Sequence, residues 1–207
     1  MILECLALVS LGLIVGLSGA VIPGPLFAFT VYDTCRKGKV TGHYIIIGHM
    51  IWELVVILTI LLGFGWLIQE NSRIILMLGG IMMAFMGLMM LRTKSNQIKM
   101  EKAKVNSSIG GGLFYSAFNP TQPIWWATAG IALLATGLNL IGLWGVVLVT
   151  FGHWLSDFAY YTLVSYIVHH YKHFVNPKQK LISTILGFFV ITLGAYFITQ
   201  GLGLYFY

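Results

Sequence analysis

Long apolar runs, separated by short polar segments, organise the whole chain. Charge-free runs occupy residues 5–32, 74–91 and 181–207, and a longer one extends over 105–156. A helix needs roughly 20 apolar residues to cross a bilayer, so each run is close to or above that length. A further apolar stretch, 44–68, is interrupted only by Glu53. The pattern predicts six membrane helices, at about 4–32, 42–68, 73–91, 109–136, 140–168 and 181–206.

The composition agrees with a protein that lies almost entirely in a membrane. The 207 residues are 58% hydrophobic and 9% charged, and the mean hydropathy is +0.87. A soluble domain of this composition would expose far too much apolar surface. The first apolar run follows Glu4 rather than a basic segment and is too long for a signal peptide, so we expect a retained span. The expected fold class is an all-α membrane protein without a soluble domain.

The basic residues are distributed unevenly between the predicted loops. Eleven of the twelve lysines and arginines fall in the loops after the first, third and fifth helices, and Arg73 is the exception. Cytoplasmic loops are enriched in basic residues, so these three loops are expected in the cytoplasm and both termini outside it. The net charge of +6 is then a topology signal. With the aromatic residues inside the spans, we expect no nucleic-acid binding.

The first half of the chain is repeated, faintly, in the second half. Three landmarks recur in the same order: a proline-interrupted segment, a Gly-His-x-x-x-acid frame, and two glycines seven residues apart. They lie at 20–25 and 117–123, at 48–53 and 152–157, and at Gly80/Gly87 and Gly187/Gly194. Two copies of a three-helix unit must lie antiparallel in a membrane, which is the plan of many secondary transporters. We therefore expect repeat one over 1–91, a basic cytoplasmic linker over 92–108, and repeat two over 109–207.

The proline motifs predict a break in the first helix of each repeat. Pro23, Gly24 and Pro25 stand inside the first span, and Asn119 and Pro120 stand inside the fourth. Proline removes a backbone donor and clashes with the preceding turn, so a straight helix is costly at both places. Ordinary proline kinks are the structural alternative. Breaks at corresponding positions of two repeats favour a binding site near the middle of the membrane.

Two histidine–acid pairs are the second candidate for the site. His49 precedes Glu53 by one helical turn, and His153 precedes Asp157 by the same distance, so each pair shares a helix face. An acid at membrane depth is costly and is functional by default. The residues are compatible with a carboxyl group that loads and releases a proton, with binding of a substrate's ammonium group, or with metal ligation. Buried hydrogen bonds between helices are the structural alternative.

Three further features of the sequence give weaker evidence about the site and the function. The glycines at heptad spacing are expected to let helices pack closely. Trp125 and Trp126 follow the second break, where they either wall a pocket or pack against lipid. A Gly-rich phosphate loop, an H-E-x-x-H motif and a G-x-S-x-G motif are all missing from the sequence, so we expect neither an enzyme nor a cofactor.

These motifs resemble the lysine exporter (LysE) family of amino-acid efflux proteins. The resemblance rests on Pro23-Gly24-Pro25 in the first of six spans, Asn119-Pro120 in the fourth, and the acid Asp157 in the fifth, and it covers the whole chain. It implies export of amino acids from the cytoplasm, coupled to a proton gradient or to the membrane potential. Leu26 and Thr121 depart from the Asn and Lys that many members have after the two motifs. The chain therefore resembles a branch distinct from the lysine and homoserine exporters.

Together these observations predict a six-helix secondary transporter of the cell membrane. The expected substrate is an amino acid or a related small metabolite, and the partners are a coupling proton and the lipid bilayer, with homo-oligomerisation left open. The expected site contains Pro23, Gly24, Pro25, His49, Glu53, Asn119, Pro120, His153 and Asp157, without a resident metal. One alternative is an exporter of divalent metals that uses the two histidines and the two acids. The other, from a different class, is a membrane scaffold or an electron-transfer subunit.

Overall fold

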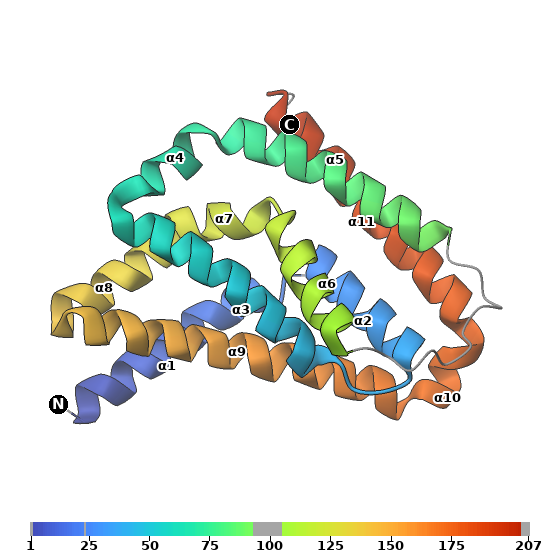
Figure 1. The fold of residues 1–207 in the computed structure, drawn as a ribbon, viewed down its shortest axis with the longest axis horizontal. Helices are drawn as coiled ribbons and strands as arrows, with labels where there is room; N and C mark the ends of the chain where they lie inside the picture. Colours follow the sequence, from blue (N-terminus) through green and yellow to red (C-terminus); the bar gives the residue numbers. More distant parts are fainter. Residues whose placement is uncertain (1, 23, 93–104, 204–207) are drawn as a thin grey trace.

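The computed structural model describes residues 2–22, 24–92 and 105–203, and within them it is helical with no strand (Figure 1). Most of the predicted linker, 92–108, lies outside these residues, and so does Pro23. The first half contains α1 (Ile2–Ala20), α2 (Pro25–Lys37), α3 (Gly42–Thr59), α4 (Gly65–Glu70) and α5 (Ser72–Leu91). The second half contains α6 (Val105–Ala117), α7 (Thr121–Trp125), α8 (Ile131–Ile141), α9 (Leu143–His170), α10 (Lys172–Val175) and α11 (Gln179–Gly201). π-Helical turns over Ile60–Phe64 and Trp126–Gly130 join α3 to α4 and α7 to α8.

The helices end where the sequence no longer favours a continuous helix. α1 stops at Ala20, and α2 starts with Pro25, whose fixed φ and missing N–H suit the first position of a helix. α6 stops at Ala117, and α7 starts at Thr121, directly after Pro120. Further along, Gly63 has a φ of 86° inside the π-helical turn, which bends the chain between α3 and α4.

Three helix pairs form most of the bundle. α1 packs on α9, α3 packs on α6, and α5 packs on α11 along its length (Figure 1). Glycines lie at each crossing, as predicted. A Cβ added to Gly152 would meet the backbone of α1, and one added to Gly48 would meet the backbone of α6. Gly80 faces Gly194 and Gly87 faces Gly187 between α5 and α11. Small residues allow this close approach of helices in a membrane.

The outer surface of the bundle is apolar. Ile2, Leu62, Leu143 and Trp144 each expose more than two thirds of their surface. Five described helices are long and apolar enough to span a membrane: 2–20, 42–67, 72–91, 121–141 and 180–201. Six spans were predicted. The predicted first and fourth spans, 4–32 and 109–136, are each interrupted at a helix break, and α9, which covers the predicted fifth span, is not among the five. It has 28 residues, but His153, Ser156 and Asp157 lie buried in its middle and lower its mean hydropathy.

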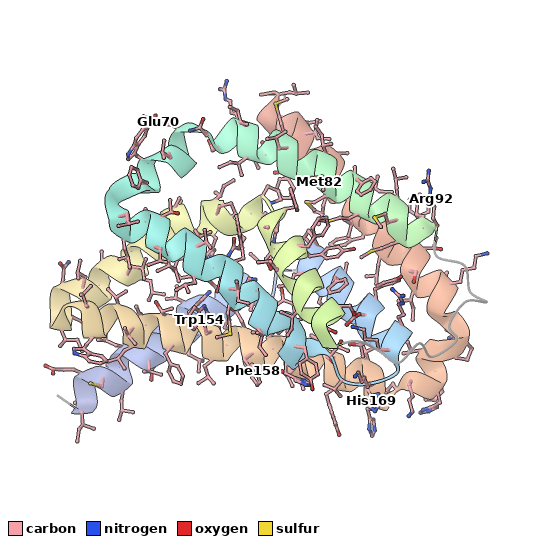
Figure 2. All side chains as sticks on the ribbon, viewed as in Figure 1. Glu70, Met82, Arg92, Trp154, Phe158 and His169 are labelled. Carbon is pink, nitrogen blue, oxygen red and sulfur yellow. The ribbon has the colours of Figure 1, made fainter. Side chains whose placement is uncertain are left out.

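The ends of the helices separate into two groups. In Figure 1 the start of α1, the end of α11, α4 and the α8–α9 turn lie toward the left and upper edges. The loop before α3, the end of α5, and α10 lie toward the right and lower edge. Glu70 and Arg92 mark the two sides in Figure 2.

Candidate functional site

The crossing of α3, α6, α1 and α9 brings both histidine–acid pairs to one place. Gly48 and Gly152 each precede the histidine, and their missing side chains let α3 approach α6 and α9 approach α1. The next helical turn then carries Glu53 in α3 and Asp157 in α9. Both acids are buried, with 2% of their surface exposed. The two predicted pairs therefore form one cluster.

Glu53 is the centre of this cluster. Its Oε1 accepts hydrogen bonds from Trp126 Nε1 at 2.9 Å and from Gln122 Nε2 at 3.3 Å, and its Oε2 accepts one from Trp154 Nε1 at 2.9 Å. The Nε2 atoms of His49 and His153 lie 3.2 and 3.1 Å from Oε1. Four nitrogen atoms thus lie around Oε1, and one contacts Oε2. Figure 2 labels Trp154 in α9, near the crossing with α3.

Asp157 has a different environment. Its Oδ2 lies 3.2 Å from His153 Nε2 and 3.6 Å from His49 Nε2. Neither contact has the geometry of a hydrogen bond, and within the described chain Oδ2 has no hydrogen-bond partner although it is buried. A buried acceptor without a donor is costly and rare. Asp157 Oδ2 therefore has only the two histidine contacts as polar partners among the described residues, which makes it a candidate for binding a ligand.

The hydrogen bonds around His49 indicate where a proton lies. Ser116 Oγ donates to the carbonyl oxygen of Gly112 at 2.7 Å, so it accepts from His49 Nδ1, also at 2.7 Å. With its proton on Nδ1, a neutral imidazole would present only a lone pair from Nε2 to the Glu53 carboxyl. A protonated imidazole would instead present an N–H from Nε2 to the acids, at 3.2 Å from Glu53 Oε1 and 3.6 Å from Asp157 Oδ2.

His153 is held by aromatic rings. Its imidazole stacks on Trp125, with ring centres 4.9 Å apart and planes at 21°, and meets Trp126 edge-on at the same distance. Its Nδ1 faces Gly16, where a Cβ would collide with the ring, and has no hydrogen-bond partner among the described residues. The ring is therefore oriented so that Nε2 points at Glu53 and Asp157.

A cavity of about 470 Å³ lies against this cluster. All four residues of the two pairs line it, together with Gly24, Pro25 and Asn119 from the helix breaks. The two breaks meet here, because Asn119 Nδ2 lies 3.9 Å from the position of a Cβ on Gly24. Pro120 is not among the lining residues, and its ring packs against Gly79 in α5. Pro23 lies outside the described residues.

Four polar partners of the cluster were not singled out from the sequence: Ser116, Gln122, Trp154 and, as a hydrogen-bond donor, Trp126. Gln122 stands within the second proline motif, and this position was the one feature of the sequence that could have indicated its place in the site. The tandem tryptophans were expected either to wall a pocket or to pack against lipid, and the structure places the two differently. Trp125 lines the cavity, and Trp126 is fully buried and donates to Glu53.

Three side chains of the cluster are close enough to share a metal ion. Ligand atoms of His49, Glu53 and Asp157 lie within 4.8 Å of one another. Imidazole and carboxylate are ligands for zinc and similar divalent ions. However, Glu53 already accepts hydrogen bonds from two indoles and an amide, so it would have to give up some of them to bind an ion.

Comparison with protein families identifies the chain. Residues 17–201 match the model of the LysE type translocator family, so the protein belongs to this family. The match confirms the resemblance drawn from the proline motifs and the acid of the fifth predicted helix. Searches of curated proteins and of solved structures found no match. The protein is a multi-pass membrane transport protein and not an enzyme.

Proposed function

We propose that this LysE family protein is a secondary active exporter of amino acids or related small metabolites, driven by a proton gradient or by the membrane potential. The observation that carries the proposal is the joining of both histidine–acid pairs at a cavity that both helix breaks also reach. A buried cluster of two imidazoles and two carboxylates, one of which has an oxygen without a hydrogen-bond partner among the described residues, provides groups that can bind a proton and an amine-bearing substrate.

The proposed architecture is six spans in two inverted repeats, 1–91 and 109–207, joined by the linker 92–108. The contacts between α1 and α9 and between α3 and α6 support it, because each pairs the first helix of one repeat with the second helix of the other. Facing glycines in α5 and α11 pair the third helices. Both termini would be extracytoplasmic, and the basic ends near α10, the end of α5 and the loop before α3 would face the cytoplasm.

In this proposal, transport alternates access by rocking one repeat against the other. The cavity is lined by Leu76 near the start of α5 and Gln200 near the end of α11, which would be the extracytoplasmic side. Toward the opposite side, Asp33 pairs with Lys37 at 3.0 Å and accepts a hydrogen bond from Ser108 at 2.7 Å. Both side chains of this ion pair belong to α2 and are buried, and the hydrogen bond from Ser108 to Asp33 ties α2 to α6.

A second group of polar contacts lies at the same level. Ser165 Oγ in α9 accepts hydrogen bonds from the backbone N–H groups of Thr41 and Gly42, at 2.7 and 3.0 Å, and from Thr34 in α2 at 3.1 Å. Together with the Asp33–Lys37–Ser108 contacts, these bonds close the bundle on the proposed cytoplasmic side. They are the contacts that must separate for the substrate to enter from the cytoplasm.

Counterflow in proteoliposomes tests the proposed function. Vesicles loaded with an unlabelled amino acid should accumulate the same labelled amino acid, and a proton gradient should drive net movement. The helix breaks are tested by Pro120→Ala, which should remain inserted and folded but transport more slowly. Failure of every amino acid in the panel to exchange would contradict the proposal.

Topology is tested with single cysteines in a background that lacks Cys5 and Cys35. Lys39→Cys and Asn71→Cys should react with impermeant reagents from opposite sides of the membrane. Labelling of both from the same side would contradict the six-span arrangement.

Export of a divalent metal is the second candidate, favoured by the close ligand atoms of His49, Glu53 and Asp157. In that case His49→Gln, Glu53→Gln, His153→Gln and Asp157→Asn should abolish metal efflux to a similar degree. Zinc should also raise the melting temperature of the wild type by mass action. A defect in the acids alone, without stabilisation by zinc, would support amino-acid export.

A further inference from the structure

The walls of the cavity differ between its two ends, and the difference bears on which side chains a substrate can have. The end at α3 and α9 is polar and contains Glu53 and Asp157, which are the only acids among its described lining residues. The end at α5 and α11 is formed mainly by Leu76, Leu193 and Phe197, with the uncharged side chains of Tyr196 and Gln200 beside them. No lysine or arginine lines the cavity in the described part of the chain.

The two acids are not equally available to a ligand. Both oxygens of Glu53 already accept hydrogen bonds from protein donors. Asp157 lines the cavity. Its Oδ2 lies 3.2 Å from His153 Nε2 and 3.6 Å from His49 Nε2 and has no hydrogen-bond partner among the described residues. An ammonium group from the cavity would satisfy it with a charge-assisted hydrogen bond. The cluster therefore has one carboxylate oxygen for one ammonium group.

Donors for a carboxylate lie at the meeting point of the helix breaks. Asn119 Oδ1 accepts hydrogen bonds from the N–H and the hydroxyl of Thr121, at 3.2 and 2.8 Å. This fixes the amide so that Nδ2 is directed to Gly24 at the cavity wall. The ammonium and carboxylate groups of an α-amino acid can thus be bound between Asp157 and Asn119, and its side chain then extends along the remaining wall.

We infer that the cavity selects α-amino acids with apolar side chains, aliphatic or aromatic, over lysine and arginine. The inference rests on the proposed export function and names its substrate class. A second positive charge would reach the end lined by Leu76, Leu193 and Phe197, where no described acid can pair with it. Burying an unpaired charge or polar group in apolar surroundings is unfavourable. The discrimination should be roughly 10- to 100-fold.

Competition in leucine counterflow measures this selectivity. Proteoliposomes loaded with leucine take up labelled leucine, and phenylalanine, leucine, lysine and arginine are added outside in turn. With the wild type, phenylalanine should inhibit at concentrations roughly 10- to 100-fold lower than lysine or arginine. In Leu193→Glu, a new acid at the apolar end should narrow or reverse that ratio.

Two further variants keep the test decisive if Leu193→Glu does not fold. Phe197→Ala should weaken inhibition by phenylalanine several-fold more than inhibition by leucine. Phe188→Ala is the matched control, because Phe188 is in the same helix, is 58% exposed and does not line the cavity. It should leave all ratios unchanged.

The outcomes separate this inference from the proposed function. Equal inhibition of the wild type by lysine and phenylalanine would overturn the apolar selectivity and leave amino-acid export intact. Exchange of metals but of no amino acid would overturn the proposed function itself. The inference would be supported if phenylalanine and leucine inhibit the wild type more strongly than lysine and arginine. In Phe197→Ala, inhibition by phenylalanine should then weaken while inhibition by leucine is retained.

Discussion

The two Gly-His-x-x-x-acid frames have the same spacing but different environments. In α3, Glu53 accepts hydrogen bonds from Trp126, Trp154 and Gln122 and contacts both histidines. In α9, Asp157 Oδ2 contacts both histidines and has no hydrogen-bond partner among the described residues. Glutamate is one methylene longer than aspartate, so its carboxylate extends further from its helix toward the donors of α7 and α9.

This difference indicates a division of roles within the proposed site. Glu53 links three helices through its hydrogen bonds, so its main contribution is to hold the cluster together. Asp157 has an oxygen without a hydrogen-bond partner among the described residues, so we propose that its main contribution is to transport. The shared frame therefore does not imply a shared task.

The strongest test is the removal of Glu53. Glu53→Ala leaves two indole N–H groups, an amide and two imidazoles without their acceptor. Breaking a buried charged network of this kind costs about 3–5 kcal/mol. Thermal or denaturant unfolding of the detergent-solubilised protein should show this loss. Glu70→Ala is the control: Glu70 is exposed at the end of α4, and its removal should change stability by less than about 0.5 kcal/mol.

Asp157→Asn should give the opposite result. The side chain keeps its shape but loses its charge, so stability should stay within about 1 kcal/mol of the wild type. Transport should fall roughly 10- to 100-fold, because a hydrogen bond between charged groups is worth about 1.5–3 kcal/mol. Counterflow and melting of the same preparation measure both. If Asp157→Asn is as unstable as Glu53→Ala, the division of roles is wrong.

Substitution of either glycine that precedes a histidine should lower the stability of the protein, by a similar amount at both positions. In Gly48→Ala and Gly152→Ala the new Cβ would collide with the backbone of α6 and α1, respectively. Each helix pair would have to move apart, at about 1–3 kcal/mol. Gly110→Ala in α6 is the control, because nothing lies within 4 Å of its Cβ position. That variant should be neutral or slightly stabilised, and equal melting of all three would refute the close crossings.

The smallest expected effect concerns a single donor to Glu53. Trp154→Phe keeps the aromatic bulk but removes the hydrogen bond to Oε2, which should cost about 1–2 kcal/mol. Trp144→Phe, at an indole that is 76% exposed in the same helix, should have almost no effect. Indistinguishable stabilities of these two variants would show that Glu53 does not depend on Trp154.

Several features of this protein follow from its sequence alone. Apolar runs and the alternating basic loops predicted an all-α membrane protein, since hydrocarbon requires helices whose backbone bonds are satisfied internally. The proline motifs and the repeated histidine–acid frame predicted the candidate site residues. The proline motifs and the acid of the fifth predicted helix indicated the family, and the family match confirms the family. These signals are local, because each depends on spacing within one helix or on residue type.

The tertiary structure was needed to show that the two Gly-His-x-x-x-acid frames have different environments. Glu53 is 69 residues from Gln122 and 101 residues from Trp154, so no spacing pattern predicts these hydrogen bonds. The packing of Pro120 on Gly79 and the position of Trp125 at the cavity wall likewise depend on how helices from opposite halves meet. The sequence places an acid in each half of the chain. Only the packing of helices from both halves decides that Glu53 is enclosed by donors and that Asp157 retains a free oxygen.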